Sequence, residues 1–592
     1  MTETTTAPAS APTSPALDKD LLASRARRYG PLYQAERQLR SMRAYASVIV
    51  ASAVFQPLMY VLAMGLGLGV LVGAGNDFSE YGATSYLMYI GPAILASTVA
   101  LSAGVEFTFP VMSGFRWQRL YYGAQATALR PEQIAGGHIL AVCCRFALQA
   151  AVFLVVLTLF GALSSPLAVL QIFTAALGGL AIGLPIMAYF SSLREEKGHA
   201  ALAQRFVVMP LFLFSGTFYP LENLPAFLQV IGWVSPIWHA NELGRLLAFG
   251  QPTPGWLILV HLLYLGVLAL AGGLVVRRMF ARRLGYSEWR GRTPGSRADA
   301  RRAAKQDVKE LAYSEGGAYQ RSEGVPPARF SRGPLSHLYS GNIRAVFQRG
   351  LTAIRNNRGV IFLSGFLEPV LFLTSFSLGI SPMIEGVEIG ERAVSYAAFI
   401  APALLAVSAM NGAVFDSTWN VFFKLKITKL YQNMMATSLG PIDVAAGEIF
   451  LALFRGGIYA AGFLVVLTGA GLVDPLPAVL MWCAALFIAF GFASVGMALT
   501  SFMKRFQQMD WMTMALMPMF LFSATLFPID VYPQGVQYVI QALPLWHAVE
   551  LMRAIAFWDL TAMTAVHVGY FLALIAVGMS VTTIRMRALF QR

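Results

Sequence analysis

The chain carries one apolar block twice, and this repetition limits its fold more than any other feature. Residues 209–220 read MPLFLFSGTFYP and residues 517–528 read MPMFLFSATLFP, so eight of twelve positions are identical at an offset of 308. The identity continues downstream, where Pro236, Trp238, His239, Glu242 and Arg245 recur as Pro544, Trp546, His547, Glu550 and Arg553. Self-similarity on this scale indicates a duplicated structural unit.

The duplication extends along most of both halves. Matching residues upstream of the block include Arg43, Pro57, Tyr86, Pro92, Tyr121, Pro131 and Arg145, which recur as Arg355, Pro369, Tyr396, Pro402, Tyr431, Pro441 and Arg455. If each unit crosses a membrane an even number of times, the two units run parallel and are related by an axis along the membrane normal.

Composition places the chain in a membrane. Charged residues make up 12% of it, against roughly 25% in soluble domains. The net charge of +14 is concentrated, because residues 277–340 hold fourteen Lys/Arg and six Asp/Glu. Basic residues crowded beside apolar runs indicate the cytoplasmic side of a membrane rather than nucleic-acid binding. The three cysteines have neither the spacing of a disulfide framework nor that of a metal site.

Six membrane spans are expected in the first half, followed by six in the second. The first-half spans are expected near residues 44–75, 81–112, 135–159, 167–193, 206–218 and 256–276, and the second-half spans near 359–381, 395–420, 445–470, 476–502, 511–527 and 562–584. Residues 220–245 are apolar but contain Pro220, Pro225 and Pro236. We expect a helical hairpin there that dips into the outer leaflet, and an equivalent hairpin in the second half.

These spans give an all-α protein of two parallel six-helix repeats, with twelve transmembrane helices and re-entrant outer hairpins. Residues 1–21 are expected to form a disordered tail, 22–284 a first transmembrane domain, 285–339 a cytoplasmic linker and 340–592 a second domain. Basic stretches near residues 22–44 and 340–358 suit amphipathic helices on the inner membrane surface. With this count the basic clusters share one side, which places both termini in the cytoplasm.

The polar loop at 113–137 and its twin at 423–447, with the blocks 209–245 and 517–553, resemble those of ABC-2-type exporter permeases. That family includes exporters of antibiotics, nodulation factors and polysaccharides. The resemblance implies six spans in each domain, a helix between spans 2 and 3 that touches an ATPase, and pairing of two domains. Both domains are fused in this chain.

The resemblance also implies a separate ATPase, in two copies or as two paralogues, because the chain lacks a phosphate-binding loop. None of its eight lysines follows a glycine and precedes a hydroxyl residue, as that loop requires. ATP and Mg²⁺ are therefore expected on the partner, and no cofactor on this chain. An ion-gradient-driven facilitator is the alternative; an integral-membrane enzyme is disfavoured, since few acidic or histidine residues cluster.

The loops between spans 2 and 3 are the predicted ATPase-coupling surfaces. They contribute Arg116, Arg119, Tyr121 and Pro131, with Lys426, Lys429, Tyr431 and Pro441 in the second half. Membrane anchoring by positive charge alone would explain the cations, but not the repeated Leu-Tyr.

Four charged residues lie inside predicted spans, at equivalent positions in the two halves. Because an unpaired charge at such depth costs roughly 2.5–3.5 kcal/mol even on a lenient scale, we expect the pairs Glu106–Arg145 and Asp416–Arg455. Structural linkage of spans 2 and 3 is favoured over contact with the cargo.

The repeated hairpin signature has two interpretations. Trp238, His239, Glu242 and Arg245, with Trp546, His547, Glu550 and Arg553, could anchor each hairpin through an interfacial Trp and an i, i+3 ion pair. They could also form an outer gate that parts during export. No metal site is expected at the histidines.

The two halves differ at two polar positions. Gln56 matches Glu368, and His138 matches Glu448. A lopsided charge along the path would favour a cationic or amphipathic cargo, such as a drug, a lipid or a glycolipid.

Overall fold

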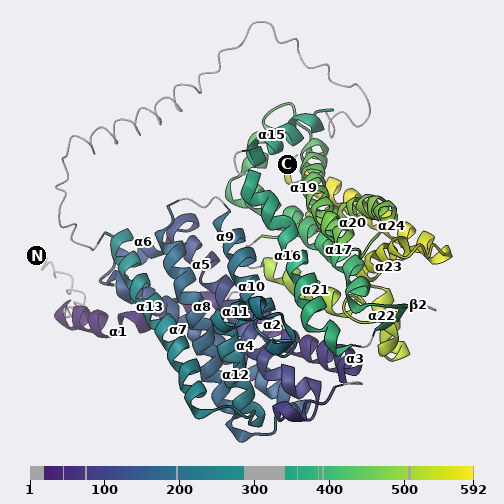
Figure 1. The fold of residues 1–592 in the computed structure, drawn as a ribbon. Helices are drawn as coiled ribbons and strands as arrows, with labels where there is room; N and C mark the ends of the chain where they lie inside the picture. The colour runs from purple at the N-terminus through teal and green to yellow at the C-terminus, as the bar shows by residue number, and fades with distance from the viewer. Residues whose placement is uncertain are drawn as a thin grey trace, which may run out of the picture.

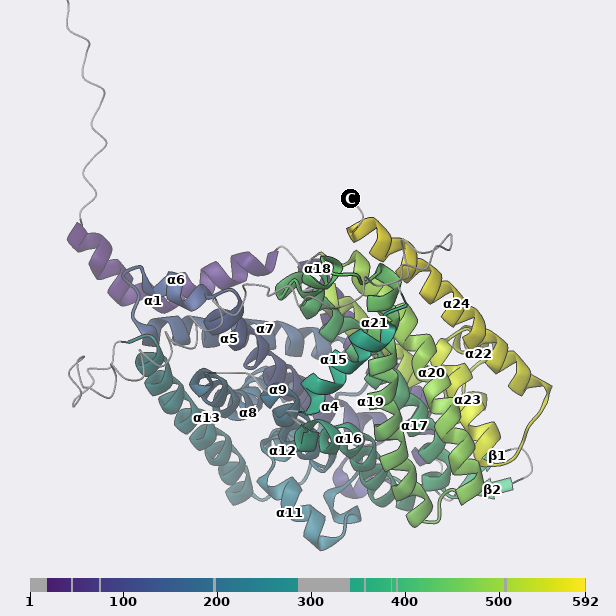
Figure 2. The ribbon, with the colours of Figure 1, turned by 90° about the horizontal axis from the view of Figure 1, so that it is seen from above.

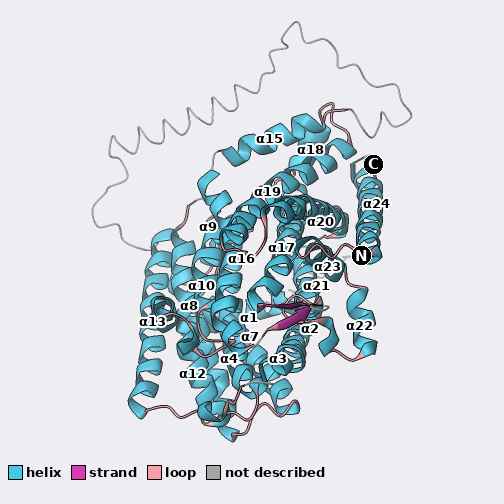
Figure 3. Ribbon diagram, turned by 45° about the vertical axis from the view of Figure 1, so that its right-hand side comes forward, coloured by secondary structure: helices cyan, strands magenta, loops and turns pink. Residues whose placement is uncertain are grey.

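The structure is a computed structural model of the 592-residue chain. It describes residues 19–43, 46–73, 76–194, 198–285, 341–355, 358–384, 386–389, 392–504 and 508–590. Most of the expected tail and linker therefore lie outside the described residues. Figure 3 shows that the described part is built almost entirely of helices.

Two helical bodies lie side by side, the first purple to teal and the second green to yellow (Figure 1). The first contains α1 (Lys19–Met42), α2 (Ala46–Tyr60), α3 (Gly69–Gly73), α4 (Tyr86–Glu106), α5 (Phe109–Met112), α6 (Leu120–Gln125), α7 (Pro131–Leu159), α8 (Gln171–Ser192), α9 (His199–Leu202), α10 (Met209–Leu213), α11 (Ala226–Val234), α12 (Pro236–Phe249) and α13 (Gly255–Arg283). The second contains α15 (Ile343–Arg355), α16 (Arg358–Gly379), α17 (Tyr396–Phe415), α18 (Leu430–Met435), α19 (Pro441–Gly469), α20 (Pro475–Phe502), α21 (Met509–Phe522), α22 (Gln534–Gln541), α23 (Pro544–Ala556) and α24 (Ala562–Phe590).

Ten helical stretches of the described chain are long and apolar enough to cross a membrane. They fall on the predicted first, second, third, fourth and sixth spans of each half. At the two predicted fifth spans stand shorter apolar helices, His199–Leu213 and Trp511–Phe522. The chain is therefore a multi-pass membrane protein, and the count of twelve stays a prediction.

A short β ribbon was not predicted from the sequence. Strands β1 (Val387–Ile389) and β2 (Arg392–Val394) form a small antiparallel ribbon between α16 and α17, with Val387 paired to Val394 and Ile389 to Arg392. Three alternating residues per strand are too few for a detectable strand pattern beside long apolar helices. The ribbon leaves the fold class essentially all-α.

Each half is arranged around its second span. The helices α4 and α17 are the most enclosed of the candidate spans, whereas α13 and α24 are the least. Figure 2 places α13 and α24 at opposite outer edges of the molecule, with α6 and α18 toward one end and α11 and the β ribbon toward the other. Because α6 and α18 belong to the predicted coupling loops, we call the first of these the coupling end and the second the hairpin end.

The helices α1 and α15 pack across the third span of their own half at equivalent glycines. A Cβ on Gly137 of α7 would lie 2.5 Å from Cβ of Gln34, and a Cβ on Gly447 of α19 would lie 2.6 Å from Cβ of Val346. Close approach of two helix backbones requires a residue without a side chain. The expected surface helices are thus fixed against the bundle by the same contact in both halves.

Candidate functional site

The two halves meet along two related seams, and in each the first span of one half packs against the fifth-span helix of the other. One seam joins α10 to α16, and the second joins α2 to α21. An aromatic ring presses on a glycine in both: a Cβ on Gly379 would lie 2.3 Å from the Tyr219 ring, and a Cβ on Gly67 would lie 2.3 Å from the Phe527 ring. These four residues occupy equivalent positions in the repeat, so the seams are related by the internal symmetry.

The seams differ in polarity. In the α10–α16 seam the Tyr219 hydroxyl lies 2.7 Å from Ser375 Oγ, and Arg205 Nε lies 3.5 Å from Glu368 Oε2. At the positions equivalent to Arg205 and Glu368, the other half of the repeat has Thr513 and Gln56. The carboxylate that distinguishes Glu368 from Gln56 is therefore engaged by an arginine across the seam, which weakens its use as an argument for a cationic cargo.

Equivalent aromatic residues meet between the halves. Phe109 of α5 contacts Trp419 with ring centroids 5.5 Å apart, and these positions are 310 residues apart, as throughout this part of the repeat. When two equivalent residues touch, the symmetry axis must pass between them. Trp117 and Phe423 add a second contact across the halves, with centroids 5.0 Å apart. These rings pack the region around the axis at the level of α5.

The loops between spans 2 and 3 adopt the same strained turn. Arg119 and Lys429, which precede α6 and α18, have φ values of 53° and 52°. Non-glycine residues in the left-handed region are uncommon and cost of order 1–3 kcal/mol. Both side chains are exposed, whereas Arg116 and Lys426 are half-buried. The repeated turn was not visible in the sequence, because neither position holds a glycine.

The predicted coupling tyrosines point inward rather than outward. Tyr121 is buried, with its ring centroid 4.8 Å from that of Phe115 and 5.2 Å from that of Phe280. Tyr431 is fully buried as well. Burial raises the pKa of both phenols above their ordinary value, so both remain neutral. The tyrosines anchor the loops internally, and the exposed side chains of Leu120 and Tyr122 form the outer surface of α6.

The predicted prolines begin the third spans. Pro131 and Pro441 are the first residues of α7 and α19, and both are buried. Proline suits this position because its fixed φ is helical and its missing N–H would be unpaired there. Each start is also capped: Arg130 N donates to Gln133 Oε1 over 2.9 Å, and Gly440 N donates to Asp443 Oδ2 over 2.8 Å.

His138 and Glu448 occupy equivalent positions in the two halves, and each lies beside the predicted coupling loop of its own half. His138 Nδ1 is 3.3 Å from the Tyr121 hydroxyl and 3.1 Å from Gln38 Oε1. Glu448 instead pairs with Lys424 at 2.5 Å and with Arg349 at 3.1 Å. Both residues thus link the surface helix, the third span and the coupling loop of their own half, by a neutral network in one half and by ion pairs in the other.

The charged residues inside the spans lie in pairs. Arg145 Nη1 of α7 is 2.5 Å from Glu106 Oε1 at the end of α4, and Arg455 Nη1 of α19 is 3.1 Å from Asp416 Oδ1. The carboxylates are about nine-tenths buried, and the arginines are about one quarter exposed. Each pair joins spans 2 and 3, as the sequence led us to expect. Arg145 also lines a cavity of about 40 Å³ with Gln56 and Ser102.

The hairpin arginines bind within their own half. Arg245 is fully buried; its Nη1 lies 2.7 Å from Glu242 Oε1, its Nε donates to the Tyr89 carbonyl and its Nη2 to the Gly216 carbonyl. Arg553 lies 2.9 Å from Glu550 and donates to the Ala524 carbonyl in the same way. The Gly216 and Ala524 carbonyls belong to equivalent residues with a left-handed backbone conformation, with φ of 64° at Gly216 and 54° at Ala524. This arrangement anchors each hairpin to its bundle.

Each hairpin histidine pairs with a histidine of the sixth span in its own half. The sixth-span histidines were not predicted as site residues. The Nδ1 atoms of His239 and His261 are 2.7 Å apart, and those of His547 and His567 are 2.8 Å apart. His239 stacks on Tyr264 with centroids 4.1 Å apart, and His547 stacks on Tyr570 at 4.0 Å. A signal existed, since the sixth spans share the pattern His-x-x-Tyr at an offset of 306. Trp238 and Trp546 pack edge-on against the same pairs.

The same protein family model matches each half of the chain separately. The family model described as ABC-2 type transporter matches residues 33–249 and again residues 341–557. Nodulation protein J of Rhizobium leguminosarum bv. viciae is 27% identical over 259 residues, which cover 42% of this chain and 96% of that protein. Nodulation protein J of Bradyrhizobium diazoefficiens is 27% identical over 236 residues, covering 38% of this chain and 86% of the relative. Each relative thus spans less than half of this chain.

Proposed function

The chain belongs to the ABC-2 type transporter family, and we propose that it is the fused permease of an ATP-driven exporter. It would move an amphipathic molecule, such as a drug, a lipid or a glycolipid, out of the cytoplasm or the inner leaflet. The family implies a partner ATP-binding subunit. In this proposal the partner binds ATP and Mg²⁺, and this chain supplies the membrane path.

The observation that carries the proposal is the contact of equivalent residues between the halves. The meeting of Phe109 and Trp419, together with the two glycine–aromatic seams, arranges two family domains about a common axis within one chain. A path between two such domains can open by small rotations at the seams. The aromatic contact at the axis would close this path at the coupling end and would part when the ATPases drive the halves.

The coupling surfaces are assigned to the exposed parts of α6 and α18. Arg119 and Lys429 are exposed there, and Leu120 and Tyr122 contribute apolar surface beside them. Since both halves carry the same strained turn and helix, we propose one ATPase at each, two in all. The buried Tyr121 and Tyr431 would transmit force from these surfaces into the spans.

The coupling end is assigned to the cytoplasm of a cell-membrane protein. Arg277, Arg278, Arg282 and Arg283 lie in the last two turns of α13, and Arg585 and Arg587 lie near the end of α24. Basic residues at such helix ends favour the cytoplasmic side, and on this proposal both termini would be cytoplasmic. The opposite hairpins would then face outward, where their parting would release the cargo.

The first test is the composition of the complex. We expect the tagged chain, purified mildly from its own host, to carry two ATPase subunits by native mass spectrometry. Replacing Leu120 and Tyr122 with aspartate should release the ATPase from the first half. The matched control is Arg392→Asp in the β ribbon at the hairpin end, which should leave the complex intact.

The second test is energetic. Transport of a fluorescent amphipathic probe by proteoliposomes that contain the complex should require ATP and should survive an ionophore that removes the proton gradient. Uptake or export by the bare chain that stops when the gradient is dissipated, with no ATPase retained, would refute the proposal and support the facilitator alternative.

A further inference from the structure

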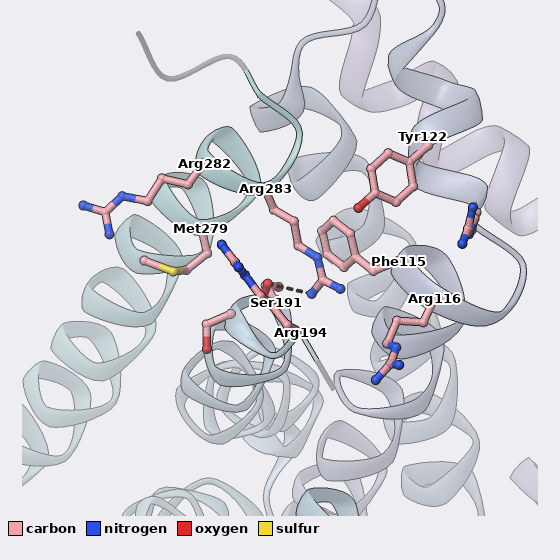
Figure 4. A pocket seen from close by; sticks show the side chains of 10 residues that line it. Phe115, Arg116, Tyr122, Ser191, Arg194, Met279, Arg282 and Arg283 are labelled. Carbon is pink, nitrogen blue, oxygen red and sulfur yellow. Dashed lines mark hydrogen bonds between the residues drawn. The ribbon is translucent and has the colours of Figure 1, made fainter. Parts of the chain in front are cut away.

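A hollow rich in arginine lies beside the first coupling loop. It has a volume of about 880 Å³, and five arginines line it: Arg116, Arg119, Arg194, Arg282 and Arg283. These residues come from the turn before α6, from the segment after α8 and from the end of α13 (Figure 4). Of the described residues that line the hollow, none is acidic.

One arginine forms a fixed wall of the hollow. Arg283 Nη1 donates to the Ser191 carbonyl over 2.8 Å, and its guanidinium carbon lies 4.0 Å from the centroid of the Phe115 ring. Arg119, Arg194 and Arg282 are exposed around it. The arginines among the described lining residues repel one another, so an anion in the hollow would relieve that repulsion.

The depth of the hollow matches that of lipid phosphates. The helix α13 has 29 residues, so at about 1.5 Å per residue it extends roughly 43 Å, the thickness of a bilayer with its headgroups. Trp256 lies at one end of this helix and the arginines lie at the other. The outer face of α13 is exposed along its length, and Met279 and Phe115 give the hollow an apolar side.

The second half has fewer arginines at the equivalent positions. Lys426, Lys429 and Lys504 stand at the positions of Arg116, Arg119 and Arg194, and Ala588 and Leu589 stand at those of Arg282 and Arg283. Arginine offers a planar fork of donors that matches two phosphate oxygens, whereas lysine acts as a point charge. The second half also has Arg585 at the position of Met279, and Arg585 donates to the Ser501 carbonyl over 3.5 Å, as Arg283 does to the equivalent Ser191 carbonyl. The first half therefore has five arginines at these positions, and the second has three lysines and one arginine.

We propose that this hollow binds the phosphate of an anionic phospholipid headgroup from the leaflet at the coupling end. Basic pockets between membrane helices at this depth suit such headgroups. Arg119 and Tyr122 of the coupling surface line one side of the hollow, but Met279, Arg282 and Arg283 place its other side on α13, whose outer face is exposed, and this favours a lipid over an acidic segment of a protein partner. The bound lipid would tie α13 to the coupling loop in one half only. This inference is independent of the cargo and of the direction of transport.

The test is lipid retention by the purified full-length chain. Phosphatidylglycerol is added to the chain in detergent, and bound lipids are counted by native mass spectrometry. The pocket variant Arg194→Gln/Arg282→Gln removes two exposed arginines. The control Arg27→Gln/Arg278→Gln removes two exposed arginines that do not line the hollow. We expect one phosphatidylglycerol to bind wild type and control alike, and the pocket variant to bind it roughly 25-fold more weakly, about fivefold per arginine.

Further measurements distinguish an anionic lipid from a zwitterionic lipid and from free phosphate, and they distinguish arginine from lysine in the hollow. Phosphatidylcholine at the same concentration should bind at least tenfold more weakly than phosphatidylglycerol, and inorganic phosphate should not displace the lipid. Arg194→Lys/Arg282→Lys, which keeps the charge but not the fork, should fall between wild type and the glutamine variant.

Three results would overturn the inference. Equal loss of lipid in the pocket and control variants would show general attraction to basic surface. Displacement of the lipid by millimolar phosphate would assign the hollow to the free anion. Unchanged lipid binding by the pocket variant, with loss of the ATPase from the complex, would assign it to the protein partner.

Discussion

Removal of one partner from an intramembrane ion pair should cost more than removal of both. Arg145 and Glu106 lie 2.5 Å apart, and the glutamate side chain is 9% exposed. Arg145→Met would leave a buried carboxylate without its cation. On insertion scales such a charge costs roughly 2.5–3.5 kcal/mol. Because the arginine is one quarter exposed and beside a small polar cavity, we expect about 2–3 kcal/mol.

The assay is thermal unfolding of the purified chain in detergent. A loss of 1 kcal/mol lowers Tm by roughly 2–4 °C in a domain of 150–250 residues, so Arg145→Met should lower the apparent Tm by roughly 4–12 °C. The double variant Glu106→Gln/Arg145→Met leaves no unpaired charge and should lose less than half of that. The exposed pair Arg277–Glu132 is the control: Arg277→Met should change Tm by less than about 4 °C, since exposed pairs contribute about 0–1 kcal/mol.

The reasoning would be refuted if Arg145→Met and the double variant lost the same stability. That result would mean that the carboxylate is well solvated without its partner, and that the importance of Arg145 lies in other contacts. Asp416–Arg455 provides an independent repetition of the experiment in the second half.

Three further predictions concern the seams and the coupling turn. Gly379→Ala, which places a Cβ 2.3 Å from the Tyr219 ring, should cost about 1–3 kcal/mol by overpacking, whereas Gly456→Ala, with open space around it, should not lower Tm; equal melting curves would contradict this. Arg119→Gly should raise stability by up to about 1 kcal/mol, because φ is 53° there and glycine adopts such values freely, yet it should lower ATPase stimulation in a phosphate-release assay; unchanged stimulation would remove Arg119 from the coupling surface. Glu368→Gln should lower Tm by breaking the contact with Arg205, while Arg205→Thr/Glu368→Gln, which copies the second seam, should restore Tm to within about 2 °C of wild type; a double variant no better than the single would show that the two seams are not interchangeable.

Much of the architecture could be predicted because its signals are local or periodic. Apolar runs of bilayer length indicated the spans, and the repeated block divided the chain into two parallel units. The pairs Glu106–Arg145 and Asp416–Arg455 could be anticipated because a charge deep in a membrane demands a partner at the same depth. The hairpin ion pairs lie three residues apart on one helix, so helical geometry alone brings them together.

Other features could not be read because they depend on which helix faces which. The sequence placed Tyr121 and Tyr431 on an outer coupling face, but packing against Phe115 and Phe280 turns Tyr121 inward. The repeated His-x-x-Tyr marks His261 as a shared position, but it does not show that His261 faces His239, which lies 22 positions earlier in the chain. The β ribbon was too short to leave a pattern. The repeated left-handed turns at Arg119 and Lys429 could not be predicted, because neither residue is a glycine.

Hydropathy and repetition are properties of the linear sequence, and they were sufficient to predict a membrane protein of two parallel, duplicated domains. The contacts that distinguish the two halves could be seen only in the folded chain. The Arg205–Glu368 contact across one seam, the different networks at His138 and Glu448, and the arginine hollow of the first half all assemble side chains from separate elements. Their physical effect arises from distance and burial, which side-chain packing sets and linear order does not.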